Sequence, residues 1–278
     1  SPWFCYLHLF DLHPLREGRK PLKIEEFQSE KFGDSLYAQT VSAIDYWLKK
    51  ILDRINFDNT LLIVTSDHGE RIPFKDKSSF KFEPEFNSVT SLGRSILPKS
   101  THNLGGKVMG KLKRTIGKTK LNYSNKDLTP YQKRSRDPHF TLSLHDELLH
   151  IPFLLKGLTL PSKIISNQIS TLDFFPTIFE LVGIMQNNTK YSSSLVSLIN
   201  NQPMTEKAIF LHTIPYEKES SLDRIGMRTS KYKYFRNSKN PKKDVHLYDL
   251  KNDPYENNNI SKNNLSIIEK MEKLLYDI

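Results

Sequence analysis

Apolar and polar residues repeat along this chain with two different periods, and these periods predict an α/β protein. Between residues 34 and 55, apolar side chains recur every three or four positions, which is the spacing of one face of an α-helix. Asp34 or Ser35 is placed to cap this helix. Residues 61–66 then form a continuous apolar run, typical of a strand covered on both faces. A helix followed by such a strand favours a mostly parallel sheet flanked by helices.

Three further segments extend this pattern. Residues 3–10 alternate loosely and are rich in aromatic side chains, so we expect a strand there. The stretch "LLHIPFLLKG", residues 148–157, predicts a second buried strand. The stretch "TLDFFPTIFELVGI", residues 171–184, predicts a helix with Asp173 as its N-cap and Gly183 as its C-cap.

The C-terminal part has a different pattern. Residues 208–213 predict a strand, and residues near 224–250 predict a small antiparallel sheet. A final amphipathic helix is expected over 262–277. We therefore expect a main α/β domain over residues 1–205 and a C-terminal subdomain over 206–278.

Positive charge is concentrated in one segment. Between Lys99 and Arg136 there are eleven basic residues and one acidic residue, an excess equal to the net charge of +10 of the whole chain. This segment lies in a stretch with weak periodicity, about 72–138, which predicts an insertion. It predicts either a solvated surface or a patch that attracts a polyanion or an anionic membrane surface. We expect no specific nucleic-acid binding.

Composition excludes some classes of protein. With 278 residues, 37% of them hydrophobic, the chain can bury a core and is not a disordered polypeptide. A single cysteine, Cys5, excludes an internal disulfide. No apolar run approaches the roughly 20 residues that span a bilayer. The chain starts in an apolar stretch without an initiator Met, so we expect its true N-terminus upstream and leave its compartment open.

Candidate chemistry begins at the end of the 61–66 strand. Asp67 and His68 follow it directly, and Gly69 allows the backbone to turn. Ligands bind beyond the carboxyl ends of strands in α/β sheets, and an Asp-His pair can face one divalent cation. Taken alone, the stretch favours the alternative of an Asp that caps the next segment beside an unrelated His.

Two other groups of polar residues shift the balance toward a site. They are His8, Asp11 and His13 after the first predicted strand, and His139, His145 and His150 before and within the 148–157 strand. Histidine is the side chain that most readily exchanges a proton near neutral pH. Of the third group, His150 is expected to be a packed or surface residue.

Five stretches in order carry a resemblance to a known family. They are "LHLFDLHPL", "YAQTVSAIDYWLKKILDRINFDNTLLIVTSDHGE", "SLHDELLHIPFLLKG", "ISTLDFFPTIFELVGI" and "LYDLKNDPYENNN". Together they resemble the sulfatase family of the alkaline phosphatase superfamily, from Tyr6 to Asn259 apart from the basic insertion. Each motif alone is weak evidence for the family, but chance does not explain five motifs that occur in the order typical of that family.

The resemblance implies a metal site that this chain supplies only in part. Asp67 and His68 resemble the second pair of metal ligands. The implied cofactor is a divalent metal, Ca2+ first, with Mn2+ or Zn2+ as alternatives. The family's first metal ligands and its nucleophile have no counterpart here, and Cys5 is not in the family's Cys-x-Pro-x-Arg motif. We therefore expect this fragment alone to be inactive.

The resemblance also implies substrate contacts. His13 matches the histidine that contacts the leaving oxygen or the anion, and His139 is the best counterpart of the residue that contacts the sulfate or phosphate. Phe140 replaces the family's usual glycine after that residue, which leaves this alignment uncertain. His8 and Asp11, in the same motif as His13, are assigned to substrate binding.

The implied activity is hydrolysis of an anionic sulfate ester, such as a sulfated polysaccharide. Phosphate or phosphonate ester hydrolysis, or transfer of a phospho-head group, are alternatives within the same superfamily. A reading from another class is a non-catalytic scaffold that holds a polyanion through its basic segment. The joint presence of Asp67, His68 and His13 argues against that scaffold.

Overall fold

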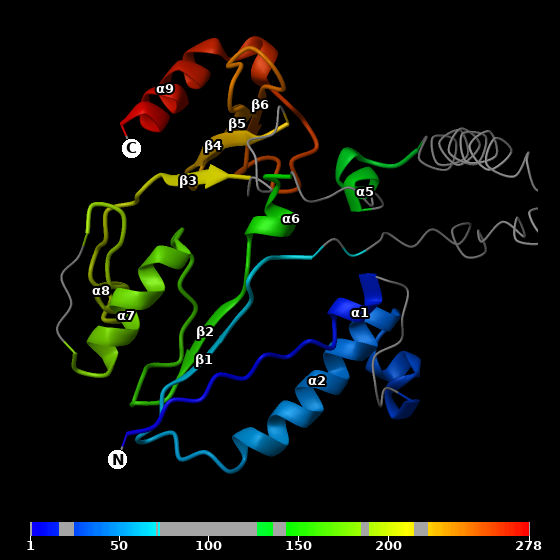
Figure 1. Cartoon of the computed structure of the whole chain (residues 1–278), viewed down its shortest axis with the longest axis vertical. Helices are drawn as coiled ribbons and strands as arrows, with labels where there is room; N and C mark the ends of the chain where they lie inside the picture. The colour runs from blue at the N-terminus through cyan, green and yellow to red at the C-terminus, as the bar shows by residue number, and fades with distance from the viewer. Residues whose placement is uncertain are drawn as a thin grey trace, which may run out of the picture. The chain divides into compact units, whose positions relative to one another are not determined.

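The computed structural model describes residues 2–16, 25–70, 72, 127–135, 143–184, 189–213 and 222–277 (Figure 1). They fall into two compact units, which we name by position. The N-terminal unit comprises Ser1–Ser66, Pro152–Ile164 and Leu181–Gly183, and the C-terminal unit comprises Asp67–Ile151, Ile165–Glu180 and Ile184–Ile278. Most of the basic segment, 99–126 and residue 136, lies outside the described residues.

The predicted helix over 34–55 is confirmed as α2, Leu36–Leu52. The predicted cap is Ser35, whose hydroxyl accepts a hydrogen bond from the Ala38 amide at 3.2 Å. Ala43 is buried on this helix and packs against Phe27 of the short 3-10 helix η1, Glu25–Phe27, which precedes η2, Glu30–Phe32. The helix is thus fixed by a local cap and by a small aromatic cluster beside its first turns.

The run at 61–66 forms strand β1, Leu62–Thr65, which pairs with β2, Phe153–Lys156. The pairing is antiparallel, with Leu62 opposite Lys156 and Thr65 opposite Phe153. β1 is half-buried, and β2 is its one partner strand in the described part of the chain. The described residues therefore contain antiparallel sheets only, and the expected central strand of a parallel sheet is not confirmed. A hydrophobic pattern does not indicate whether neighbouring strands run parallel or antiparallel. The sequence therefore could not predict the antiparallel pairing of β1 with β2.

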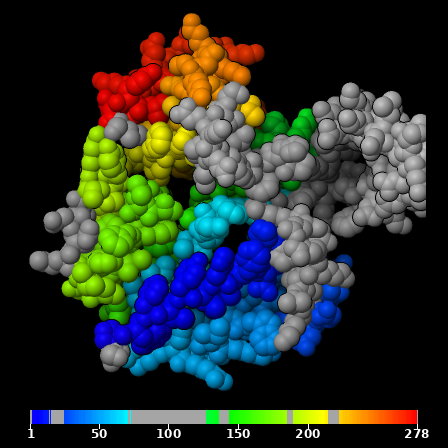
Figure 2. All heavy atoms as spheres, in the orientation of Figure 1, coloured from blue at the N-terminus to red at the C-terminus, as the bar shows by residue number. Residues whose placement is uncertain are grey.

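The expected strand over 3–10 is not confirmed in the described residues. The segment is extended but joins no ladder, and it runs over the surface of the N-terminal unit (Figure 2). Phe4 is 90% exposed and Tyr6 76% exposed. A strand is defined by hydrogen bonds to a neighbour, and apolar alternation alone cannot supply them. The segment ends in the single-turn helix α1, His13–Arg16.

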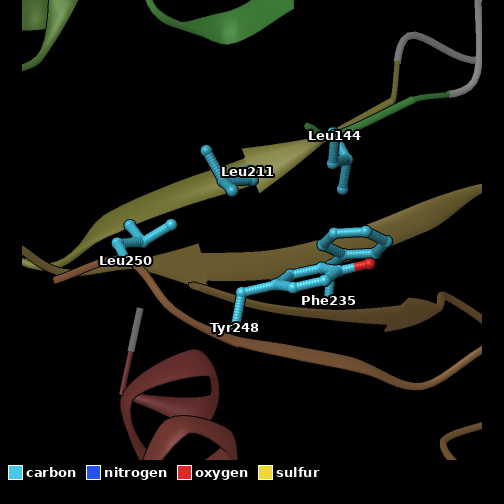
Figure 3. Packing of buried hydrophobic residues seen from close by; sticks show 5 residues of the cluster. All are labelled: Leu144, Leu211, Phe235, Tyr248 and Leu250. Carbon is cyan, nitrogen blue, oxygen red and sulfur yellow. The ribbon is translucent and has the colours of Figure 1, made fainter. Parts of the chain in front are cut away.

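The small C-terminal antiparallel sheet is confirmed. Its strands are β3, Ile209–His212, β4, Arg224–Arg228, β5, Tyr232–Asn237, and β6, His246–Asp249, paired in chain order. The last helix, α9, Leu265–Tyr276, covers one face through Met271 and Leu275. Figure 3 shows the cluster on the other face, formed by Leu144, Leu211, Phe235, Tyr248 and Leu250. The sheet is buried on both faces because each face has its own apolar cluster.

Close backbone packing inside this sheet requires a glycine. A Cβ atom at Gly226 of β4 would lie 2.1 Å from the Tyr234 carbonyl oxygen and 2.6 Å from the Phe235 Cβ. Those separations are far below contact distance, so no larger residue fits without opening the β4–β5 pair. Short elements complete the chain: α5, Pro130–Ser135, α6, Asp146–Leu149, α8, Val196–Ile199, and η5, Ser261–Asn263.

The predicted helix over 171–184 is present as η4, Thr171–Asp173, followed by α7, Phe174–Leu181. Its cap is Ser170 rather than Asp173. The Ser170 hydroxyl accepts from the Leu172 amide, and the Asp173 carboxylate accepts from the Ser170 amide, a capping box. Asp173 was the wrong cap because its carboxylate bonds backward to the residue that starts the turn. Gly183 ends the helix as predicted, with φ of +78°.

Candidate active site

Asp67 and His68 occupy one turn immediately after β1. One Asp67 oxygen, Oδ1, accepts a hydrogen bond from the His68 amide at 3.0 Å. His68 Nδ1 lies 2.6 Å from the Gly69 carbonyl oxygen, which can only accept, so Nδ1 carries the proton. In the neutral ring Nε2 is then the nitrogen with the lone pair, and it lies 3.6 Å from Asp67 Oδ2. The turn thus presents an oxygen and a nitrogen donor side by side.

Both donors are open to solvent. The Asp67 side chain is 81% exposed and the His68 side chain 45% exposed. A backbone carbonyl that holds the second ring nitrogen is the usual way in which a metal-binding imidazole is oriented. The alternative, in which Asp67 only caps the following segment, accounts for one of its oxygens. Oδ1 accepts from the amide of the next residue, His68, and Oδ2 is left to face the imidazole.

Gly69 brings this turn against helix α6. The Gly69 amide donates to the Leu148 carbonyl oxygen at 2.8 Å. A Cβ atom at Gly69 would lie 2.3 Å from the Glu147 carbonyl oxygen. The glycine is therefore required by close backbone approach, and the position of the Asp67-His68 turn depends on the position of α6.

Helix α6 is fixed by an ionic network at its first residue. The Asp146 carboxylate accepts from Arg228 Nε at 3.1 Å and from Arg228 Nη2 at 2.8 Å, and it also accepts from Lys233 Nζ. Lys233 is fully buried. Burial alone would raise the pKa of Asp146, but the hydrogen bonds from Arg228 and the charge of Lys233 outweigh it and lower that pKa to about 2.

Glu256 completes the surroundings of Lys233. Its Oε1 forms an ion pair with Lys233 Nζ at 2.8 Å, without the alignment of a hydrogen bond, and its Oε2 accepts from the Asp146 amide at 2.7 Å. Glu256 is 1% exposed and has φ of +52°, a strained conformation for this residue. Burial raises the pKa of Glu256 despite the nearby lysine.

A second ionic contact secures the next residue of α6. Arg134 of α5 binds Glu147 through both carboxylate oxygens, at 2.7 and 3.3 Å. The same guanidinium donates to the carbonyl oxygens of Glu256 and Tyr255, each at 2.9 Å. Three cations and three carboxylates are thus gathered around α6, so the network is balanced in charge.

A histidine–tyrosine chain lies on the same side of the sheet. Tyr248 Oη is 3.3 Å from His145 Nε2 and 3.0 Å from His246 Nδ1, and His246 Nε2 is 3.1 Å from Asp244 Oδ1. Burial lowers the pKa of His246, although Asp244 opposes this, and burial raises the pKa of Tyr248. Figure 3 shows the Tyr248 ring against Phe235. His145 and Tyr248 are buried in the core, which suits a structural role.

The other expected site residues lie apart from this turn in the chain. His8, Asp11 and His13 are exposed residues of the N-terminal unit, and the His13 ring stacks on Phe10 with centroids 4.4 Å apart. Since Asp67 belongs to the C-terminal unit, convergence of the two groups stays a prediction. His139 lies outside the described residues.

The network around Lys233 is what sequence reasoning missed. In "KYKYFRN" the cations stand among aromatic residues and look like the solvent face of a strand. The signal that could have found them is the pair of acids in "HDELLH" and the Glu of "DPYEN", each within an ordered motif. Across the ranges described, no three His, Cys, Asp or Glu side chains gather in a way that could hold a metal ion. None of the helices found in those ranges has the length and apolarity needed to cross a membrane.

Comparison with known proteins gives a consistent set of matches. A family model described as Sulfatase matches residues 1–184, and one described as N-sulphoglucosamine sulphohydrolase, C-terminal, matches residues 140–278. Mouse arylsulfatase K is 23% identical over 276 residues, covering 94% of this chain and 47% of the relative. The chain spans about half the length of the curated relatives it matches.

Solved structures agree at the level of the fold. The crystal structure of a protein from Bacteroides fragilis, described as a putative sulfatase, has a TM-score of 0.55 at 17% identity, covering 95% of this chain and 46% of that one. A structure solved in complex with its substrate, D-glucosamine-2-N,6-O-disulfate, has a TM-score of 0.52 at 19% identity, covering 95% of this chain and 44% of that one.

Proposed function

Because this chain belongs to the sulfatase family of the alkaline phosphatase superfamily, we propose that the whole protein hydrolyses sulfate esters and that this chain supplies part of its metal and substrate site. The observation that carries the proposal is the Asp67-His68 turn. It places an exposed carboxylate oxygen and an imidazole nitrogen 3.6 Å apart directly after β1.

The donors present fit a divalent cation as part of a larger set. Asp67 Oδ2 and His68 Nε2 are available, whereas Asp67 Oδ1 and His68 Nδ1 are engaged with the backbone. Hard cations take about six ligands, so further ligands must come from elsewhere in the whole protein. Ca2+ is the first candidate, and the imidazole donor keeps Mn2+ and Zn2+ as alternatives. When bound, the metal would neutralise the anionic ester and support the nucleophile.

The roles of the remaining residues follow from their chemistry. We assign His13 to protonate or position the leaving oxygen as the S–O bond breaks, because imidazole exchanges a proton near neutral pH. His139 is assigned to contact the sulfate, and His8 and Asp11 to bind the substrate. We also propose that β1 and the segment 2–10 join a mostly parallel sheet in the whole protein. In the described ranges each has an edge without a partner strand, which supports this.

The substrate class proposed is a sulfated sugar or polysaccharide. The substrate named for one relative of similar fold, D-glucosamine-2-N,6-O-disulfate, supports it. The excess of positive charge between Lys99 and Arg136 also supports it, since such a segment attracts polyanions.

The test of the activity is turnover of a small aryl sulfate by the whole protein. Asp67→Ala should abolish turnover and divalent-metal binding, because it removes a ligand. His13→Ala should lower kcat by about 100-fold or more, as loss of acid–base help does. Asp58→Ala is the matched control, since Asp58 is an exposed carboxylate that precedes β1. Wild-type turnover in Asp67→Ala would contradict the proposal, and preference for an aryl phosphate would favour the phosphate-ester alternative.

The basic segment can be tested separately by deleting residues 99–126. The deletion must stop there, because Arg134 belongs to the network around α6. A recruiting segment predicts weaker apparent affinity for a sulfated polysaccharide at low salt only, with the aryl sulfate unaffected, because exposed charges are screened over about 10 Å at 0.1 M salt. Unchanged kinetics on both substrates would identify a solvated surface insertion.

A further inference from the structure

Strand β5 presents two buried cations to opposite faces of the C-terminal sheet. Lys233 lies on the face of Phe235 and reaches Asp146 and Glu256. Arg236, three residues later, binds Glu272 of α9 with Nε at 2.7 Å and Nη2 at 3.1 Å. The two cations are 0% and 3% exposed, so both are deeply buried, yet only Lys233 faces α6.

A continuous path leads from Lys233 to the Asp67-His68 turn. Lys233 binds the Asp146 side chain at the start of α6, and the Leu148 carbonyl oxygen near the end of α6 accepts from the Gly69 amide at 2.8 Å. The Gly69 carbonyl oxygen in turn holds His68 Nδ1 at 2.6 Å. Every contact in this path joins residues of the C-terminal unit.

We infer that Lys233 is a positioning residue for the Asp67-His68 pair, acting through Asp146, helix α6 and the Gly69 backbone. This inference rests on the proposed function, because it takes the pair as metal ligands. The path fixes which ring nitrogen of His68 faces Asp67, and it does so from a strand that contains neither ligand.

The chemistry of the network supports positioning over simple stabilisation. Removing charges from water costs about as much as their attraction returns, so apolar residues of similar volume can stabilise a core equally well. An ionic network with three cations and three carboxylates also fixes the orientation of the elements that carry them, because each carboxylate must meet particular donors. Asp146 is held at both oxygens by Arg228 and Lys233, and this leaves α6 little freedom to slide along the sheet.

The experiment compares Lys233→Met with Arg236→Met in the whole protein. Both variants remove a buried cation from β5 and leave a carboxylate, Glu256 or Glu272, without its cationic partner, so both should lower stability. Calcium affinity, measured by calorimetry with Asp67→Ala as the baseline, should fall by about 10-fold or more in Lys233→Met. In Arg236→Met it should stay within about 2-fold, since the partner of Arg236 lies on α9.

A readout without metal uses hydrogen exchange. In the metal-free protein the Gly69 amide, which is bonded to Leu148, should exchange at least about 10-fold faster in Lys233→Met than in Arg236→Met. Where Lys233→Met does not fold, Gly69→Ala breaks the same path from its exposed end, because the added Cβ would meet the Glu147 carbonyl oxygen at 2.3 Å. It leaves every buried charge in place and should weaken calcium binding by about 10-fold or more.

The outcomes separate the two proposals. If the wild-type protein binds calcium through Asp67 but Lys233→Met, or Gly69→Ala in its place, binds equally well, the positioning inference is overturned and the proposed metal site stands. If Asp67→Ala binds the metals tested as tightly as the wild type, the proposed metal site fails, while Gly69 exchange still decides whether Lys233 holds the turn.

Discussion

Acid should weaken the C-terminal unit through Asp146 by an amount that the structure allows us to work out. The pKa of Asp146 is about 2 in the folded protein against a model-peptide value of 3.8. At about 1.36 kcal/mol per pKa unit, the difference corresponds to stability on the order of 2 kcal/mol. A lowered carboxyl pKa gives stability that is complete above pH 4 and is lost as the pH falls through 2. The Asp146 side chain is only 15% exposed, so solvent screening reduces this figure little.

The perturbation is Asp146→Asn, compared with wild type between pH 6 and pH 2. The free energy of unfolding of the wild type relative to Asp146→Asn should be constant above pH 5. It should then shrink by roughly 2 kcal/mol toward pH 2, as the wild-type carboxyl becomes protonated. Glu256 titrates with the opposite sign, because burial raises its pKa. The Asp146 charge adds to that rise, so the comparison cancels the contribution of Glu256 only in part.

The assay must report on the C-terminal unit alone. Both tryptophans, Trp3 and Trp47, lie in the N-terminal unit, so tryptophan fluorescence would follow the wrong part of the protein. Urea-dependent hydrogen exchange of peptides within 232–249, corrected for intrinsic exchange at each pH, is suitable. A difference between wild type and Asp146→Asn that stays flat down to pH 2 would refute the pairing of Asp146 with Arg228 and Lys233.

Further predictions concern the same unit. Gly226→Ala should destabilise it by about 3 kcal/mol or more in urea unfolding, because the new Cβ would meet the Tyr234 carbonyl oxygen at 2.1 Å. Gly183→Ala is a comparison in the N-terminal unit: its Cβ would meet no atom within 4 Å, and it should cost that unit only about 1–2 kcal/mol for its positive φ. Leu247→Ala, at a fully buried position, should cost about 2–5 kcal/mol, and Leu265→Ala, at a 67% exposed position, about 0.5 kcal/mol or less. Burial lowers the pKa of His246, so the stability it gives above pH 6.5 should be lost as the pH falls below that value; His246→Gln should flatten that part of the pH profile.

Local patterns predicted the local structure well. Helix α2 and its Ser35 cap follow from spacing and from one side chain, and the four-stranded C-terminal sheet follows from short alternating runs separated by turns. The partner of a strand can lie far away in the sequence, so a local pattern does not identify it. For this reason the sequence predicts a strand over 3–10 that joins no sheet in the described residues, and it does not predict the antiparallel pairing of β1.

The candidate site also has one part that the sequence singled out and one part that it did not. Asp67 and His68 are neighbours in sequence, and in their turn Asp67 Oδ2 lies 3.6 Å from His68 Nε2. The support behind them comes from Lys233 and Glu256, more than 150 residues later, and their burial runs against the usual exposure of charged residues. Hydropathy alone predicts that a lysine lies at the surface, so it could not identify Lys233 as a buried residue behind the site.

The connection between α6 and the C-terminal sheet also sets an order of events during synthesis. The four strands and α9 follow one another along the chain, so they can close over short loops without waiting for distant segments. Asp146 is synthesised before its partners Lys233 and Glu256, which follow it by 87 and 110 residues. A nascent chain stopped before Arg228 holds the Asp67-His68 turn without the contacts from Arg228 and Lys233 to Asp146 that anchor α6. The turn is thus synthesised before the residues of β4 and β5 that anchor the helix packed against it.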